Sequence, residues 1–121
     1  MERETYVEAY IIADILDDLE LRTRVTGLLI DGIGNWKRQF NWGTIHRVWH
    51  RTPKGSPLRT LILEWKMGQG PEASFGEHVS RYPKEYLEDM AVAFMNRRPG
   101  ARDVHSKQAL QIRLRAELLP K

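Results

Sequence analysis

The stretch "HRVWHRTPKGSPLRTLILEWK", residues 46–66, carries a clear hairpin signal. It joins two segments, 44–51 and 60–67, in which apolar and polar residues alternate, as in a strand with one buried face. Residues 52–57 between them contain two prolines, a glycine and a serine, a composition typical of turns. The pattern predicts a β-hairpin whose loop is longer than two residues. The second strand would carry its large side chains on one face: Leu61, Leu63, Trp65 and Met67.

The N-terminal segment has a helical period instead. Its apolar residues recur at spacings of three and four, which predicts a helix from about residue 6 to about residue 18. Its apolar stripe consists of Val7, Ile11, Ile15 and Leu19, with Ile12 and Leu16 beside it. Glycines interrupt the helical spacing in residues 21–40, so we expect a short helical turn there, followed by a strand or an irregular loop.

The second half of the chain adds a loop, a helix and a strand. Residues 68–80 are glycine-rich, and a loop of this length is usually functional or ordered by a partner. Pro83 suits the first turn of a helix. Residues 110–118 alternate between apolar and charged side chains, which predicts a strand in a sheet that is covered on one side only.

These elements predict an α+β fold. We expect a small, mostly antiparallel sheet of three to five strands with two helices packed on one face. The 121 residues are enough for one hydrophobic core but not for two, so residues 1–121 are interpreted as a single domain.

The composition limits the environment of the protein. Hydrophobic residues make up 41% and charged residues 29%, as is ordinary for a soluble globular protein. No apolar run is long enough for a membrane span, and the charged N-terminus does not resemble a signal peptide. The absence of cysteine excludes disulfides and zinc sites built on cysteine. We expect a cytoplasmic location unless the protein belongs to a virion.

The charges are distributed unevenly along the chain. In residues 1–20 every charged side chain except Arg3 is acidic. In residues 22–59 every charged side chain except Asp31 is basic. Such a chain can bind a polyanion with its middle, or a copy of itself with its acidic end against the basic middle. The predicted subunit interface comprises Asp14, Asp17, Asp18, Arg47, Trp49, Arg51, Arg113 and Arg115.

Glu64 and Lys66 resemble the E-x-K half of the PD-(D/E)xK nuclease motif. In that family the glutamate binds a divalent metal, and the lysine on the same face of the strand activates or orients water. The chemistry needs a second carboxylate on the partner strand, where this chain has Thr44, His46 and Val48. We therefore expect no enzyme and keep the nuclease as the third alternative.

The other candidate ligands favour binding over catalysis. His46 and His50 would lie roughly 13 Å apart on a strand, too far for one ion, so we expect no metal, cofactor or small-molecule substrate. Trp36, Trp42 and Trp49 are interleaved with Lys and Arg residues, a mixture that suits base stacking or a protein–protein interface. We favour the protein interface and keep a small basic nucleic-acid-binding or inhibitor module as the alternative.

Residues 13–35, "ADILDDLELRTRVTGLLIDGIGN", resemble the opening of bacteriophage tail-terminator and tail-completion proteins. In that family an acidic linker follows the first helix, and a later strand reaches an Asp-Gly dipeptide. The predicted hairpin, helix and last strand, "ALQIRLRAELL", follow in the same order.

The resemblance implies a non-enzymatic structural protein that forms a ring at the end of a phage tail and contacts other virion proteins. Its location would then be the virion, and the host cytoplasm during assembly. The loops 52–57 and 68–80 would dock against neighbouring rings. Arg113 and Arg115, on the open face of the sheet, would meet the next subunit or the lumen.

Overall fold

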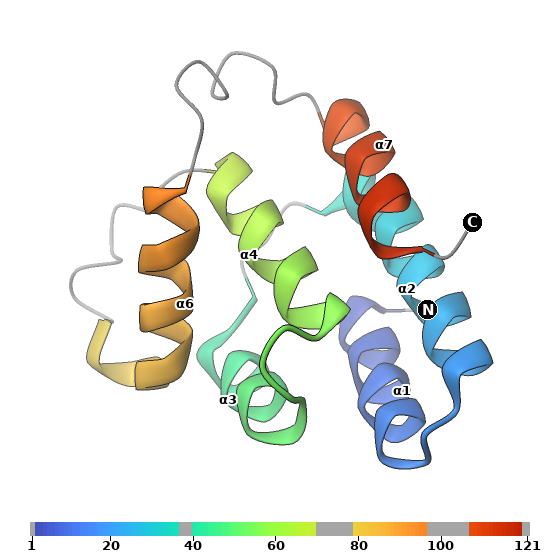
Figure 1. Ribbon diagram of the computed structural model, residues 1–121, viewed down its shortest axis with the longest axis horizontal. Helices are drawn as coiled ribbons and strands as arrows, with labels where there is room; N and C mark the ends of the chain where they lie inside the picture. Colours follow the sequence, from blue (N-terminus) through green and yellow to red (C-terminus); the bar gives the residue numbers. More distant parts are fainter. Residues whose placement is uncertain (1, 37–39, 70–78, 97–106, 120–121) are drawn as a thin grey trace.

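The computed structural model describes residues 2–36, 40–69, 79–96 and 107–119. In these ranges the chain is helical and contains no strand, so the predicted α+β fold with its antiparallel sheet is wrong (Figure 1). The α-helices are α1 (Arg3–Ile15), α2 (Leu19–Gly32), α3 (Trp42–Arg51), α4 (Pro57–Gln69), α6 (Lys84–Met95) and α7 (Lys107–Leu118). Two short 3-10 helices, η1 (Ile33–Asn35) and η2 (Val79–Arg81), complete the set.

The first strand of the predicted hairpin is helix α3. Asn41 caps its N-terminus, because the side-chain Oδ1 accepts a hydrogen bond of 2.7 Å from the backbone N–H of Thr44. Ile45, Val48 and Trp49 are buried, at the spacing of one helical face. The strand predicted for these residues is wrong; apolar and polar positions alternate through part of this segment, and that pattern also fits a strand.

The second predicted strand is helix α4. It starts at Pro57, directly after Ser56, whose Oγ accepts a hydrogen bond of 3.3 Å from the backbone N–H of Arg59. The buried side chains recur at helical spacing: Leu58, Leu61, Ile62 and Trp65. The segment between α3 and α4 does form a turn, with Gly55 at a φ of +82°, but it connects two helices.

The predicted last strand is helix α7. Leu110 and Leu114, four residues apart, are buried, whereas Ile112 between them is 65% exposed. A strand with one buried face would have buried all three residues, since residues two apart lie on the same face. The burial pattern therefore follows the helical period and overrides the alternation.

In the N-terminal half, the helix expected from about residue 6 to about residue 18 is confirmed as α1, but the segment after it differs from the prediction. Helix α2 runs through the glycine-punctuated segment as far as Gly32. Asp17 has a φ of 54°, in the left-handed region, and this residue separates α1 from α2. The helix expected after Pro83 is confirmed as α6, and its buried residues include Tyr86 and Met90.

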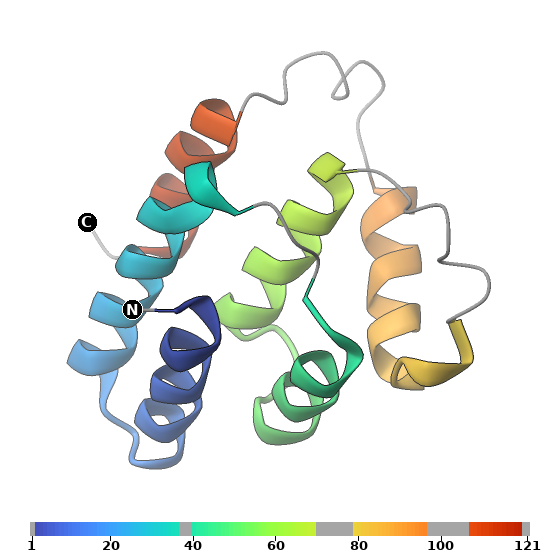
Figure 2. The same cartoon turned by 180° about the vertical axis from the view of Figure 1, so that it is seen from behind.

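Helix α4 lies in the middle of the molecule. Helices α1 and α2 form an antiparallel pair with α7 against α2 on one side of α4, and α3 and α6 lie on the other side (Figures 1 and 2). One hydrophobic cluster connects residues of all six helices. At its centre the ring of Trp65 meets those of Trp36 and Phe40 edge-on, with centroid distances of 5.7 and 5.6 Å. The guanidinium of Arg3 covers the Phe40 ring at 3.9 Å.

Candidate functional site

Four large aliphatic side chains lie exposed where α1 turns into α2. Ile12, Ile15 and Leu16 occupy one face of α1 and its end, and Leu19 begins α2; their exposed fractions are 52, 63, 67 and 60%. We call these four residues the α1–α2 corner. Single exposed aliphatic residues are common, but four of them within residues 12–19, around one turn, favour an interaction site.

The corner arises because the apolar stripe of α1 extends beyond the core that covers it. Val7, Tyr10 and Ile11 face inward and are buried. The sequence placed Ile15 and Leu19 on the same stripe as Val7 and Ile11, but α1 ends at Ile15 and the chain turns away at Asp17. The end of the stripe is therefore left outside the core.

Acidic residues border the corner. Asp17, Asp18 and Glu20 are exposed, and the Asp18 Oδ1 also caps α2 by accepting a hydrogen bond of 3.0 Å from the Leu21 N–H. Glu20 also forms an exposed ion pair of 3.7 Å with Arg24. Asp14 forms an ion pair of 2.8 Å with Arg22. The three predicted acidic interface residues, Asp14, Asp17 and Asp18, thus lie together at the corner, and Asp14 is neutralised within the chain.

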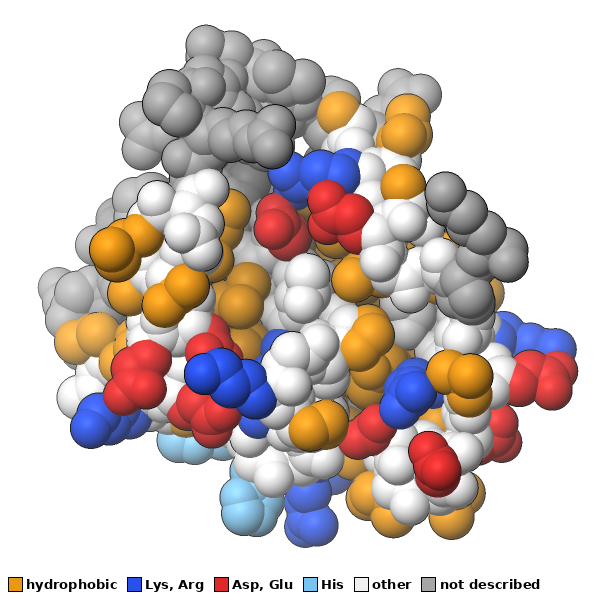
Figure 3. Space-filling model, viewed as in Figure 1, with side chains coloured by type: hydrophobic (Ala, Val, Ile, Leu, Met, Phe, Trp, Pro, Cys, Tyr) orange, Lys and Arg blue, Asp and Glu red, His pale blue; other side chains and the backbone are white. Residues whose placement is uncertain are grey.

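The basic side chains of α3 lie next to α1. Arg47 donates a hydrogen bond of 2.6 Å to Glu8 of α1. His50 and Arg51, together with Lys54 in the following turn, are exposed, and none of these three forms an ion pair with another described residue. We call His50, Arg51 and Lys54 the α3 basic face. Figure 3 shows histidine and Lys or Arg side chains at the lower edge below α3, beside acidic and hydrophobic ones below α1 and α2.

Trp49, a predicted interface residue, is buried inside one chain. Its Nε1 donates a hydrogen bond of 2.9 Å to Asp89, and its ring meets Tyr86 edge-on. Arg113 and Arg115 are also engaged within the chain. Arg113 forms an ion pair of 2.5 Å with Glu64 of α4, and Arg115 pairs with Asp31 of α2.

The E-x-K arrangement is not formed. Glu64 and Lys66 are two residues apart on a helix, which separates their directions by about 200°. Glu64 pairs with Arg113, whereas Lys66 is buried on another side of α4. The nuclease interpretation required both groups on one face of a strand, and that strand does not exist.

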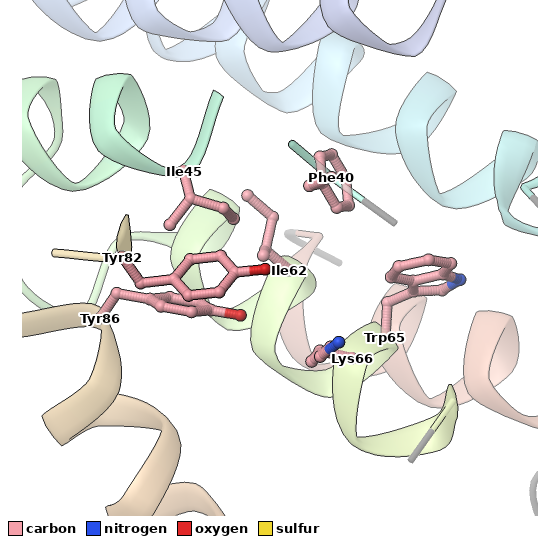
Figure 4. Close-up of a pocket in the computed structure, with 7 residues that line it drawn as sticks. All are labelled: Phe40, Ile45, Ile62, Trp65, Lys66, Tyr82 and Tyr86. Carbon is pink, nitrogen blue, oxygen red and sulfur yellow. The ribbon is translucent and has the colours of Figure 1, made fainter. Parts of the chain in front are cut away.

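Lys66 lines a small cavity with aromatic walls (Figure 4). Tyr82 and Tyr86 lie on one side of the lysine and Trp65 on the other. The space inside, about 10 Å³, is no more than one water molecule needs. The cavity is too small for a substrate. Its lining is Phe40, Ile45, Ile62, Trp65, Lys66, Tyr82 and Tyr86.

Sequence reasoning missed Arg59, a buried side chain with several hydrogen bonds. Only 4% of this residue is exposed, and its Nη2 donates to the backbone oxygens of Trp49 and Thr52 at 2.7 and 2.6 Å. Its Nη1 lies 2.7 Å from a carboxylate oxygen of Glu85 in α6. The guanidinium therefore satisfies carbonyls at the C-terminal end of α3 and ties α3, α4 and α6 together. An arginine followed by Thr60 and three apolar residues carries no sequence signal of burial.

The tryptophans offer little surface for nucleic-acid bases. Trp36, Trp49 and Trp65 are buried; Trp42 is 39% exposed, with the guanidinium of Arg81 over its ring at 4.5 Å.

Helix α6 carries a second exposed apolar group, in which Val92 and Met95 are 56 and 83% exposed.

The described residues bear on the expectations about metal ions, membrane spans and the loop 68–80. Within the described residues, His, Asp and Glu side chains form no group of three that could hold a metal ion. None of the described helices combines the length and apolar character needed to cross a membrane. Of the predicted loop 68–80, residues 70–78 lie outside the described part of the chain.

Compared with models of protein families, with curated proteins and with solved structures, the chain matches none.

Proposed function

We propose that this protein is a non-enzymatic assembly protein that acts by self-association through the α1–α2 corner. The observation that carries the proposal is the exposure of four neighbouring aliphatic side chains, each by more than half. Such side chains supply no acid, base, nucleophile or metal ligand, and their one strong tendency is to leave water.

The free energy gained by burying the corner can be compared with the free-energy cost of association. Full burial of a Leu or Ile side chain is worth about 1.5–3 kcal/mol, so covering the exposed half of four such residues yields about 4 kcal/mol. Association costs about 4–15 kcal/mol in lost translational and rotational freedom. The corner by itself therefore does not hold a stable complex, which needs further contacts on the opposing surface.

The test is the size of the purified chain, measured by native mass spectrometry and light scattering over a wide concentration range at low and high salt. We expect a discrete oligomer for the natural chain and a monomer for the double variant Ile15→Ser, Leu16→Ser. The matched control is Ile112→Ser on α7, an equally exposed aliphatic residue that lies outside the corner. A natural chain that stays monomeric at every concentration would overturn the proposal.

The alternative function, a nucleic-acid-binding module, is tested by binding to oligonucleotides. A nucleic-acid module would bind oligonucleotides with a steep dependence on salt and would weaken on Arg51→Ala. With three tryptophans buried, the basic charge of α3 is what favours that function among the described residues. Placement in a phage tail or virion remains a prediction of the resemblance in residues 13–35. The hairpin and last strand cited for that resemblance are helices, so our proposal rests on the exposed surface instead.

A further inference from the structure

We infer that two copies meet as a closed two-fold dimer, in which the α1–α2 corner of each copy covers the α3 basic face of the other. This inference rests on the proposed self-association and specifies its form. It replaces the ring that the resemblance in residues 13–35 implies.

The two surfaces lie at the same end of the molecule. In both views of the fold the turn between α1 and α2 and helix α3 are at the lower end (Figures 1 and 2). Helix α3 packs against α1, and the ion pair of 2.6 Å between Arg47 and Glu8 connects them. The corner and helix α3, which carries Arg51 of the basic face, are therefore neighbours; Lys54, in the turn after α3, also borders the hollow between α4 and α6.

Opposite charges favour contact between unlike surfaces. A dimer with corner on corner would bring the Asp17, Asp18 and Glu20 carboxylates of one copy toward those of the other, and like charges in an interface disfavour association. A corner placed on the α3 basic face instead brings these carboxylates toward Arg51 and Lys54, which have no ion-pair partner among the described residues.

The basic side chains also suit the apolar part of the corner. Lys and Arg carry long aliphatic stems that can cover apolar surface while the charged group stays at the edge. The stems of Arg51 and Lys54 and the imidazole of His50 would cover the exposed aliphatic side chains. Their cationic groups would then reach the acidic border.

Symmetry follows from the neighbouring placement. Two complementary patches that lie side by side on one face match twice when a second copy is turned by a two-fold rotation. Such an interface is closed and leaves no unpaired patch. A head-to-tail ring would need the two patches on different sides of the subunit, whereas here they share one end.

The decisive experiment is a charge exchange between two variants. The first, Asp17→Lys with Glu20→Lys, makes the corner basic; the second, Arg51→Glu with Lys54→Glu, makes the α3 face acidic. Each variant alone would oppose like charges in both contacts, and we expect its dissociation constant to rise about tenfold or more. An equimolar mixture pairs opposite charges in both contacts, so we expect a heterodimer, identified by its mass in native mass spectrometry.

Each other outcome has a definite meaning. If the second variant dimerises alone as the natural chain does, corner meets corner and the inference is wrong. If the mixture forms larger rings or chains, the contact is head-to-tail and the inference is also wrong. A monomeric natural chain would instead defeat the proposed self-association itself.

A second variant guards against loss of folding at Asp17, whose left-handed conformation disfavours lysine. Asn tolerates this conformation, so Asp17→Asn with Glu20→Gln removes both charges at little structural cost. We expect a weaker dimer whose remaining affinity depends less on salt than that of the natural chain. An unchanged affinity and salt dependence would count against the inference.

Discussion

Arg59 on α4 and Glu85 on α6 form an ion pair of 2.7 Å in which the arginine is almost wholly buried and the glutamate is half exposed. The two ends of this pair therefore have different roles. The same guanidinium also donates to Trp49 O and Thr52 O, which are buried with it. Arg59 donates hydrogen bonds to buried backbone oxygens, whereas Glu85 mainly neutralises the charge of Arg59 from the surface.

This asymmetry predicts unequal effects of substitution. Arg59→Met leaves the two backbone oxygens without a donor, and we expect it to lower the free energy of unfolding by about 3–5 kcal/mol. Glu85→Gln alters a half-exposed partner, and we expect a loss of no more than about 1 kcal/mol. Urea denaturation of both variants measures the difference. Equal losses would show that Arg59 contributes only through the surface ion pair.

Tyr10 is the second buried polar group with an energetic consequence. Its residue is 0% exposed, and its hydroxyl has no hydrogen-bond partner among the described residues. A buried donor without an acceptor is costly, so Tyr10→Phe should raise the free energy of unfolding by about 1 kcal/mol. Thermal and urea denaturation test this. A clear destabilisation would show that the hydroxyl is satisfied after all, for example by a buried water.

The same residue predicts a change of stability with pH. Burial raises the pKa of Tyr10 above its ordinary value of 10.0. The Leu58 backbone and the Ser56 hydroxyl lower this pKa by a smaller amount. Neither group forms a hydrogen bond of ordinary geometry with the Tyr10 hydroxyl. Because the folded state holds this proton more tightly, the stability is complete below about pH 10 and declines as the pH rises above it. The difference in stability between the natural chain and Tyr10→Phe isolates the effect and should vary above, but not below, that pH.

Helix α7 allows a direct test of the corrected fold. In a helix only Leu114 of the pair Ile112 and Leu114 is buried, whereas a strand would bury both. We expect Leu114→Ala to cost about 2–5 kcal/mol of unfolding free energy. For Ile112→Ala we expect a change within about 0.5 kcal/mol. Similar losses for the two variants would contradict the helix.

The candidate site was predicted only in part. Asp14, Asp17 and Asp18 do lie together, because they are close in sequence around one turn. The aliphatic corner was not predicted, since a helical stripe does not reveal where the core that covers it ends. Arg47, Arg113 and Arg115, which are predicted subunit contacts, form ion pairs within the chain with residues distant in the sequence, and this part of the interface stays a prediction.

Features that depend on near neighbours along the chain could be predicted: the N-terminal helix, the helix after Pro83 and the turn between residues 52 and 57. The choice between helix and strand in segments 60–67 and 110–118 depended on packing in three dimensions. Their apolar residues satisfy both periods, since Leu61 and Trp65 share a face at the spacing of either element. A strand needs partner strands for its backbone hydrogen bonds, whereas a helix satisfies its own. The packing of each helical face against its neighbours therefore determined the fold.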